Sequence, residues 1–437
     1  MFMQRNFLKL ILSAFVFLLS AAGSSYAQEA KTDVWDLNKC ITYAKDNSIK
    51  VKQMLLEVNS SQVDLLKSKS ERLPAVNASF TEGFNNSLNS SSTGFSLSTS
   101  MNLYSGGAIT NGIKKSKLNV ELANLNLEET RNDISLSIVQ AYLNILYAKE
   151  SSDYYKEVVA ASQKQVDRAR ELRRAGSIAQ KDLAQLDAQL ASDNYSSVVA
   201  QNKVTSNSTT LKQLLEIPVT DTFNVAFPNV DMNDSLVVMP TLQEALNAAL
   251  SVRPEIKGSI ISTSIAETDL KISKAGYLPS LSLSADYSTS YTPESSVAFG
   301  NQFSDNQNKK LGLTLSIPIF NRNTTRTSVQ QSKIDLERAK LSYTETEKNL
   351  LQTVESVYQD AVAALSRYKS AKVQLESAAE SYTLSEQQFN LGMINIVELL
   401  DVKTSLLNAK SELVQAKYSA VLNLKILDFY MGKSITL

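Results

Sequence analysis

The sequence has no histidine, a single cysteine, and little glycine or proline. Its 437 residues include 13 glycines and 8 prolines, a composition that favours long helices. Without histidine there is no histidine base or histidine metal ligand, and the single Cys40 excludes an internal disulfide. A glycine-rich phosphate loop, a G-x-S-x-G elbow and Cys/His metal spacing are also missing. We therefore expect no enzymatic activity, no cofactor and no metal site.

The charges of the chain are balanced. There are 44 basic and 44 acidic residues, so no basic excess indicates nucleic-acid binding. Beyond the N-terminal segment, no stretch contains the ~20 consecutive apolar residues that a transmembrane helix needs.

Residues 1–27 have the pattern of an export signal. Arg5 and Lys9 precede an apolar run from Leu10 to Leu19, and Ser25-Tyr26-Ala27 is a small-x-small cleavage site. A membrane anchor is the alternative, but the apolar run is too short for one. Cys40 does not lie in a lipid-attachment pattern and is expected to be a buried helical thiol.

The remaining chain contains a long internal repeat. Leu73-Pro74 recurs 205 residues later as Leu278-Pro279, and Gly176 recurs 216 residues later as Gly392. The repeat divides the chain into a first unit (28–216), a linker (217–240) and a second unit (241–437). Each unit reads as helix, strand, strand, very long helix, helix.

The hydrophobic period defines these elements. In the first unit a helix is expected from Leu37 to Arg72, followed by two strands within 75–104, because Pro74 disfavours helix in the residue before it. In the second unit the strands lie within 280–320, with alternation continuing through Ile317 and Ile319. Two helical runs without proline or glycine, 114–174 and 324–390, end at the matched glycines, and a second helix then runs back.

The strands have the length and alternation of membrane-spanning barrel strands. A soluble sandwich hairpin is the alternative, which the Ser-, Thr-, Asn- and Gly-rich polar face makes less favourable. Four strands cannot close a barrel, and lipid does not tolerate open edges. Several chains must therefore share one barrel; two chains would supply eight strands and three would supply twelve.

The helix after Gly392 has two apolar seams. Lys403, Lys410 and Lys417 lie between the seams, and the opposite side begins with Glu398 and Asp401. Two seams separated by two polar faces suit a helix in the single-layer wall of a water-filled tube. A three-stranded coiled coil with charged outer positions is the alternative.

Taken together, the chain resembles the TolC family of outer-membrane efflux proteins. The resemblance rests on the duplicated unit, on Leu73-Pro74 and Leu278-Pro279 before the strands, and on Leu103-Tyr104-Ser105-Gly106-Gly107 and Ile317-Pro318-Ile319-Phe320-Asn321 after them. The most specific part is the segment from Gly392 to Leu413. The resemblance implies a mainly α fold with a membrane β-barrel: a homotrimer whose shared twelve-stranded barrel in outer-membrane lipid continues into an α-helical tunnel in the periplasm.

The resemblance also implies a function and its residues. The chain is expected to be the exit duct of a tripartite efflux or type I secretion system, docking onto a periplasmic adaptor and an inner-membrane pump. The acidic selectivity ring of the family maps onto Glu398 and Asp401, with Asp182 as the acidic residue of the first unit. The helical turns around the two matched glycines are expected to meet the adaptor; they contain Gly176, Ser177, Gly392 and Met393.

The chain departs from the family pattern at the closed-state lock. The founding member has an arginine and a tyrosine where this chain has Ile394 and Phe389, so a different closing contact is needed. Two readings without transport remain open from the sequence, a trimeric surface adhesin and a structural stalk of the cell envelope.

Overall fold

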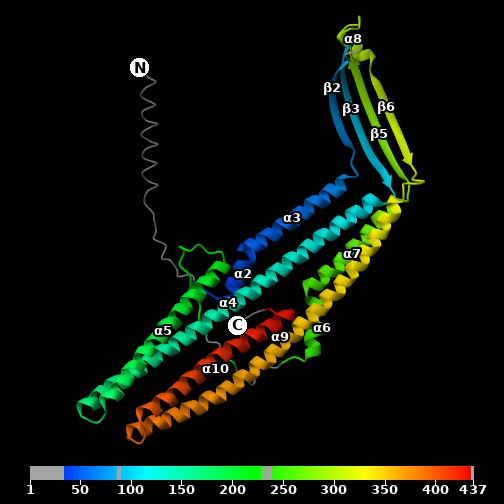
Figure 1. The fold of residues 1–437 in the computed structure, drawn as a ribbon. Coiled ribbons are helices and arrows are strands. Elements are labelled where there is room, and N and C mark those ends of the chain that lie inside the picture. Colours follow the sequence, from blue (N-terminus) through cyan, green and yellow to red (C-terminus); the bar gives the residue numbers. More distant parts are fainter. Residues whose placement is uncertain (1–33, 86–89, 229–231, 233–238, 435–437) are drawn as a thin grey trace, which may run out of the picture.

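The computed structural model describes residues 34–85, 90–228, 232 and 239–434. They form an elongated molecule with a β-sheet at one end and two long helical hairpins at the other (Figure 1). The predicted signal peptide, 1–27, lies outside the described residues, as does much of the segment from 229 to 238 in the predicted linker.

The two units have corresponding elements. The first contains α2 (Leu37–Asn47), α3 (Ile49–Ser70), β2 (Ala75–Asn85), β3 (Ser90–Ser105), α4 (Ala108–Arg174) and α5 (Gln180–Leu214). The second contains α6 (Leu242–Val252), α7 (Pro254–Ala275), β5 (Ser280–Tyr291), α8 (Phe299–Asp305), β6 (Asn308–Ser316), α9 (Thr324–Asn390) and α10 (Ile396–Tyr430). Two short strands, β1 (Val34–Trp35) and β4 (Asn224–Val225), pair in parallel beside the first unit. Helix α8, which the sequence analysis did not predict, lies in the part of the second unit that is longer than the first.

The sheet contains four antiparallel strands in the order β2-β3-β5-β6. Its central pair joins the two units, with Leu97 opposite Tyr287 and Met101 opposite Leu283. Strands β2 and β6 pair on one side only and form the two edges. Large apolar side chains on both edge strands are exposed, among them Phe80 at 70% and Leu311 at 79%.

The last strand is shorter than predicted. Strand β6 ends at Ser316, whereas the alternation of the sequence continues to Ile319. Pro318 has no N–H to donate to a neighbouring strand, and the pairing with β5 ends at Ser316 opposite Ser280. The apolar residues from 317 to 320 therefore form the connection to α9, so this part of the prediction is wrong.

The predicted helix from Leu37 to Arg72 is two helices. Ser48 has φ −57° and ψ 134°, an extended conformation that separates α2 from α3. The second unit breaks at the equivalent place, where Pro254 is the first residue of α7. Proline suits the first position of a helix, but Ile49 stands at this position in the first unit, so the sequence contains no signal for the break there.

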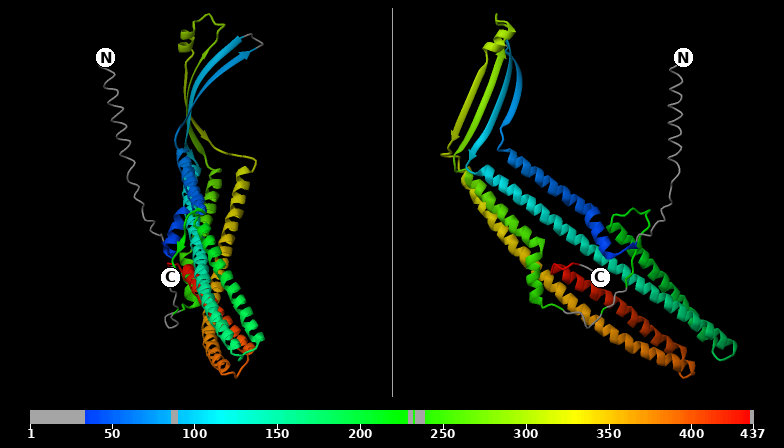
Figure 2. Two further views of the ribbon diagram at one scale, coloured as in Figure 1. Left: turned by 90° about the vertical axis from the view of Figure 1, so that its left-hand side faces the viewer. Right: turned by 180° about the vertical axis from the view of Figure 1, so that it is seen from behind.

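The long helices α4 and α9 each contain 67 residues, which corresponds to about 100 Å. Each begins after a residue in the left-handed conformation, Gly107 at φ 84° and Asn323 at φ 63°. The two hairpins, α4 with α5 and α9 with α10, lie side by side, as both views in Figure 2 show, and α10 also contacts α4.

The main core lies where the two units meet, near the middle of the molecule. Cys40 of α2, Tyr142 of α4 and Val414 of α10 are buried there in one cluster. The Tyr142 hydroxyl donates a hydrogen bond to the carbonyl of Ala226 at 2.7 Å, which ties the segment after β4 to the long helix. Burial, and next the nearby Asp36 carboxylate, raise the pKa of the Cys40 thiol to about 12, so this cysteine is an inert core residue, as expected.

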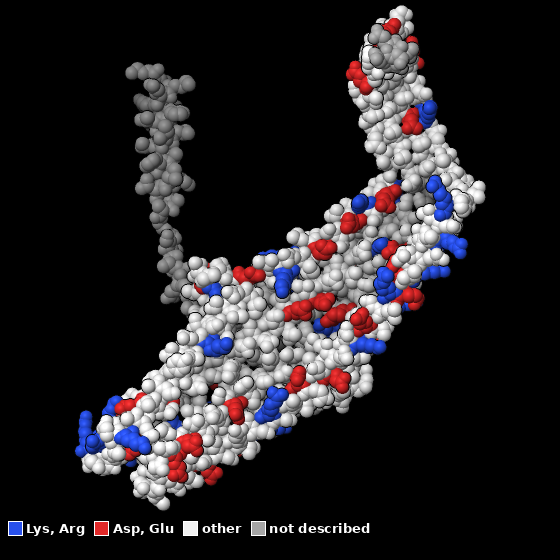
Figure 3. Space-filling view, viewed as in Figure 1, with Lys and Arg blue, Asp and Glu red and all other residues white. Residues whose placement is uncertain are grey.

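Charged side chains are distributed unevenly. In Figure 3 acidic and basic residues alternate along the helical part, whereas the visible face of the sheet carries few of either sign. None of the helices among the described residues is long and apolar enough to cross a membrane.

Candidate functional site: the hairpin tips

The two hairpins turn in the same way at the end farthest from the sheet. Gly176 and Gly392 have φ of 76° and 73°, a conformation that favours glycine. In the first turn the N–H of Ser177 donates to the carbonyl of Leu172, and in the second the N–H of Met393 donates to that of Gln388, each at 2.9 Å. Together with the bond from each glycine N–H to the carbonyl three residues earlier, this is the Schellman motif that ends a helix.

The docking residues predicted from the sequence lie on these exposed turns. Met393 is 69% exposed, and a Cβ added to either glycine would meet no atom within 4 Å. The glycines are thus required by backbone conformation and not by crowding. The second turn presents two large apolar side chains to the outside, Met393 and Leu391, the latter 76% exposed.

The predicted pore acids lie near the starts of the return helices. Glu398 and Asp401 are exposed on α10, and the side chain of Asn395 caps this helix by accepting from the N–H of Glu398 at 3.0 Å. Asp182, which is partly buried, accepts from the N–H of Ala179 at 3.3 Å and so caps α5. Asp182 and Glu398 lie in the first turns of their helices, where the helix dipole also favours carboxylates, which gives these two acids a local structural role.

On the lysine face of α10, Lys403 and Lys417 contact the other hairpin of the chain. The sequence, in contrast, predicts a polar face in contact with water. Lys403 is buried: its ammonium donates to Ser162 Oγ at 2.6 Å and lies 3.1 Å from Asp193 Oδ2. Ser162 also donates to Asp193, and Gln189 donates to the other carboxylate oxygen at 2.8 Å. The Lys403 and Asp193 side chains are 6% and 5% exposed.

A second ionic contact lies farther from the tip. Lys417 on α10 reaches Glu150 on α4 at 2.5 Å, and the hydroxyl of Tyr418 donates to the same carboxylate at 2.8 Å. The lysine face therefore points into the seam between the two hairpins. The expectation that this polar face contacts water, as in the wall of a water-filled tube, is wrong for Lys403.

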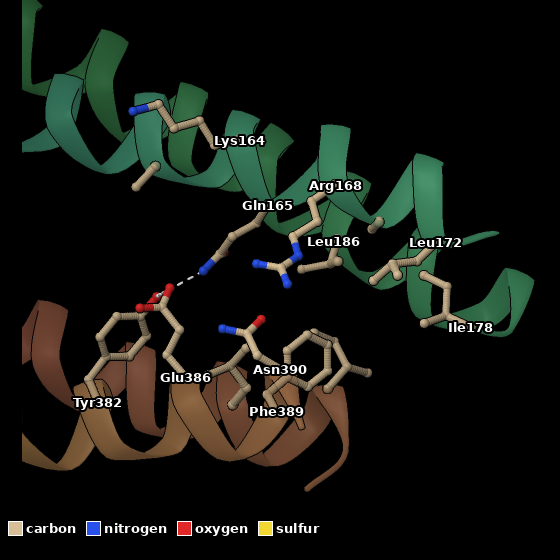
Figure 4. Close-up of a pocket in the computed structure, with 14 residues that line it drawn as sticks. Lys164, Gln165, Arg168, Leu172, Ile178, Leu186, Tyr382, Glu386, Phe389 and Asn390 are labelled. Atoms are coloured by element: carbon tan, nitrogen blue, oxygen red, sulfur yellow. Dashed lines mark hydrogen bonds between the residues drawn. The ribbon is translucent and has the colours of Figure 1, made fainter. Parts of the chain in front are cut away.

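A cleft of about 420 Å³ separates the two hairpins near their tips. Figure 4 shows Gln165 and Arg168 of α4 on one side and Tyr382 and Glu386 of α9 on the other. Gln165 donates to the Tyr382 hydroxyl at 2.8 Å across the cleft. Burial, and next the Glu386 carboxylate, raise the pKa of Tyr382 to about 12, so this hydroxyl stays protonated at neutral pH.

The residues at the family's lock positions are part of an apolar cluster. Phe389 and Ile394 pack against buried Ile396 and Leu399 of α10 and Val166 of α4. They contribute apolar packing at the positions where the founding member of the family has its polar lock. The buried polar contact nearest these residues is the one that joins Lys403 to Ser162 and Asp193. Neither Ser162 nor Asp193 was predicted from the sequence, because small polar residues on a long helix resemble a solvated face.

Comparison with known proteins identifies the family. A family model described as outer membrane efflux protein matches residues 41–216 and 245–433, which is most of the chain. The chain belongs to the outer membrane efflux protein family. The channel function and outer-membrane location predicted from the sequence are those of this family.

Individual relatives have low sequence identity to this chain but align with most of its length. Outer membrane protein TolC of Escherichia coli is 26% identical over 294 residues, covering 66% of this chain and 59% of that protein. Outer membrane protein TolC of Vibrio cholerae is 22% identical over 420 residues, and the alignment covers 89% of this chain and 89% of that protein. A crystal structure of CusC superimposes with a TM-score of 0.79 at 18% identity, covering 94% of this chain and 96% of that one. The predicted family is confirmed, and the CusC likeness establishes the fold.

Proposed function

We propose that this protein is the outer-membrane exit duct of a tripartite efflux or type I secretion system. Family membership carries this proposal, and the shape agrees with it: a sparsely charged sheet at one end and long charged helices extending away from it. In this arrangement the sheet lies in the outer membrane and the helices extend into the periplasm. The hairpin tips then face the inner membrane.

The assembly that we propose is a homotrimer. Strands β2 and β6 each have one unpaired edge, and unpaired backbone groups are not stable in lipid. Three copies of the four-stranded sheet close a twelve-stranded barrel, which is within the range of membrane barrels. The edge of β2 in one chain would then pair with β6 of the next.

The helices also lack a neighbour that a second copy would supply. Helix α7 packs against both α4 and α9, whereas α3, its equivalent in the first unit, packs against α4. Val63 of α3 is 64% exposed, and its equivalent in α7, Thr268, is 1% exposed. Likewise Val198 of α5 is 59% exposed, although its equivalent in α10, Val414, is 2% exposed. Covering these surfaces of the first unit with the second unit of another chain removes the difference.

In the trimer, Glu398 and Asp401 line the narrow mouth of the tunnel, with Asp182 contributed by the first unit. Both α10 acids are exposed on the side away from buried Lys403. Three chains bring six α10 carboxylates together, and such a ring attracts cations and repels anions. The exposed turns at Gly176, Ser177, Gly392 and Met393 are the proposed contact with the periplasmic adaptor, which links the duct to an inner-membrane pump.

Two measurements test the proposal. Light scattering of the detergent-solubilised protein should give a mass of three chains, and reconstitution in planar bilayers should give discrete, cation-selective conductance steps. A stable monomer would contradict the shared barrel. A trimer without conductance would instead support an envelope stalk or adhesin.

A further inference from the structure

The residues that make polar contacts between the two hairpins of one chain are not repeated at the equivalent positions of the other unit. If six hairpins form a ring, as the proposed trimer requires, the ring has two kinds of seam. One lies within a chain, where α10 meets α4 and α5. The other lies between chains, where α5 of one chain meets α9 and α10 of the next. The repeat offset of 216 residues relates each position in one seam to a position in the other.

The seam within the chain is fastened by buried charge. Lys403, Asp193 and Ser162 come from three different helices, α10, α5 and α4, and all three are buried. We call these three residues the latch. An ammonium and a carboxylate that are removed from water separate only at high cost unless water or another partner replaces the contact, so the latch holds the two hairpins in one register.

The equivalent positions in the other seam cannot form a latch. Ser162 and Asp193 correspond to Ala378 and Ala409, neither of which has a polar side chain. Lys403 corresponds to Asp187, which is exposed and already paired with Arg170 of its own hairpin at 3.1 Å. Two further contacts are not repeated either. The ion pair of Glu150 with Lys417 corresponds to the uncharged Ser366 and Gln201. The hydrogen-bonded Gln165 and Tyr382 correspond to Ser381 and Val166, and the valine has no polar group.

We infer that the two hairpins of each chain move as one body and that the mouth of the tunnel widens at the seams between chains. This inference rests on the proposed trimer. The latch is a positioning device: it fixes α10 against α4 and α5, and thereby fixes where Glu398 and Asp401 of that chain stand. The neutral seam has no buried ion pair to break, so it opens first.

Matched cross-links across the two seams test this. Arg168→Cys with Glu386→Cys spans the cleft within a chain, where both residues line the same cavity. The equivalent pair between chains is Leu384→Cys with Arg170→Cys; these native side chains are 53% and 47% exposed. Native Cys40 is buried and does not react. A cleavable bifunctional thiol reagent joins each pair, and only the second pair joins separate chains on a denaturing gel.

The readout is the largest conductance level that the channel reaches under applied voltage in planar bilayers. We expect the cross-link between chains to lower this level roughly threefold or more, since it ties the mouth, and cleavage of the reagent to restore it. The cross-link within a chain should leave the level unchanged. Equal effects of both cross-links, an effect of the cross-link within a chain alone, or no effect of either would overturn the inference.

A second variant ties the effect to the latch itself. Lys403→Met with Asp193→Asn removes both charges and changes the side-chain volumes little, so the chain folds without an unpaired buried ion. In this variant we expect additional conductance levels, which the cross-link within a chain abolishes. Asp187→Asn is the control and should behave as wild type. If the double variant also behaves as wild type, the latch does not position the hairpins.

Failure of the assembly gives a different result. If the pair between chains never joins two chains and light scattering gives a monomer, the proposed trimer is wrong and the inference falls with it. If trimers form and conduct but the cross-links do not differ, the proposed function stands and the latch inference alone is overturned.

Discussion

The two units have the same pattern of elements but different neighbours. Val414 is buried against the core of the first unit, whereas its equivalent Val198 is 59% exposed. Lys403 is buried in an ion pair, whereas its equivalent Asp187 is an exposed surface residue. The second unit finds its partner within the same chain, and the first unit presents the matching surface to the outside. A duplicated chain can in this way encode an assembly, because each unmatched surface specifies the partner that it lacks.

The largest effect on stability is expected from removing only one of the two buried charges of the latch. Lys403→Met leaves the Asp193 carboxylate buried without its cation, and we expect it to lower the free energy of unfolding by about 3–5 kcal/mol. The repeat-equivalent change, Asp187→Asn, should stay within about 0.5 kcal/mol because Asp187 is exposed. Urea unfolding followed by helical circular dichroism measures both. Similar stability of the two variants would mean that the Lys403 contact is not formed.

The next effect separates packing within the chain from packing between chains. Val414→Ala removes two methyl groups from a buried cluster, and we expect a loss of about 2 kcal/mol in the free energy of unfolding. Val198→Asp should leave the stability of the chain nearly unchanged but weaken the proposed trimer, since it puts a charge into an apolar seam. Light scattering across a dilution series measures the second effect. Trimers of wild-type strength for Val198→Asp would remove α5 from the proposed interface.

A smaller effect comes from the ends of the two return helices. Both α5 and α10 end in a left-handed residue, which is Glu216 at φ 57° in the first unit and Gly432 at φ 76° in the second. We expect Glu216→Gly to raise the free energy of unfolding by about 1 kcal/mol, because only glycine adopts this conformation freely.

The matched substitution at the end of α10 is expected to have the opposite effect on stability. Gly432→Ala should be destabilising, because the added Cβ would lie 2.6 Å from Val252 Cγ1. Thermal unfolding of both variants measures the difference. A loss of stability in Glu216→Gly would show that the glutamate side chain makes a contact that outweighs its backbone strain.

The smallest expected effect concerns the acids at the mouth. The second unit has Glu398 and Asp401, whereas the first has Asp182 and, at the position of Asp401, Gln185. We expect Glu398→Gln with Asp401→Asn to lower the cation-to-anion permeability ratio by roughly threefold and to weaken block by multivalent cations. Asp182→Asn should have less effect. Reversal potentials in asymmetric salt give the ratio, and a wild-type ratio for the double variant would place these acids outside the ion path.

The sequence by itself determined the family, the repeat and the two very long helices, because period, proline and glycine act locally along the chain. It placed the start of the first at residue 114, whereas α4 begins at Ala108 and continues through Gly112. It also located the hairpin turns, since Gly176 and Gly392 are needed where φ is positive. The strands show where such local reasoning stops. The alternation of apolar and polar residues continues to Ile319, but β6 ends at Ser316, two residues before Pro318.

Only the tertiary structure decided what the polar faces contact. A polar stripe on a helix has the same period whether it faces water or a buried carboxylate. Lys403 and Asp193 are 210 residues apart in the chain, so no local pattern relates them. The position of Ser48, an ordinary serine that separates α2 from α3, was likewise undetermined until α2 and α3 each packed against α4. Helix formation is governed by neighbouring residues, whereas the pairing of buried charges depends on which distant helices the fold brings together.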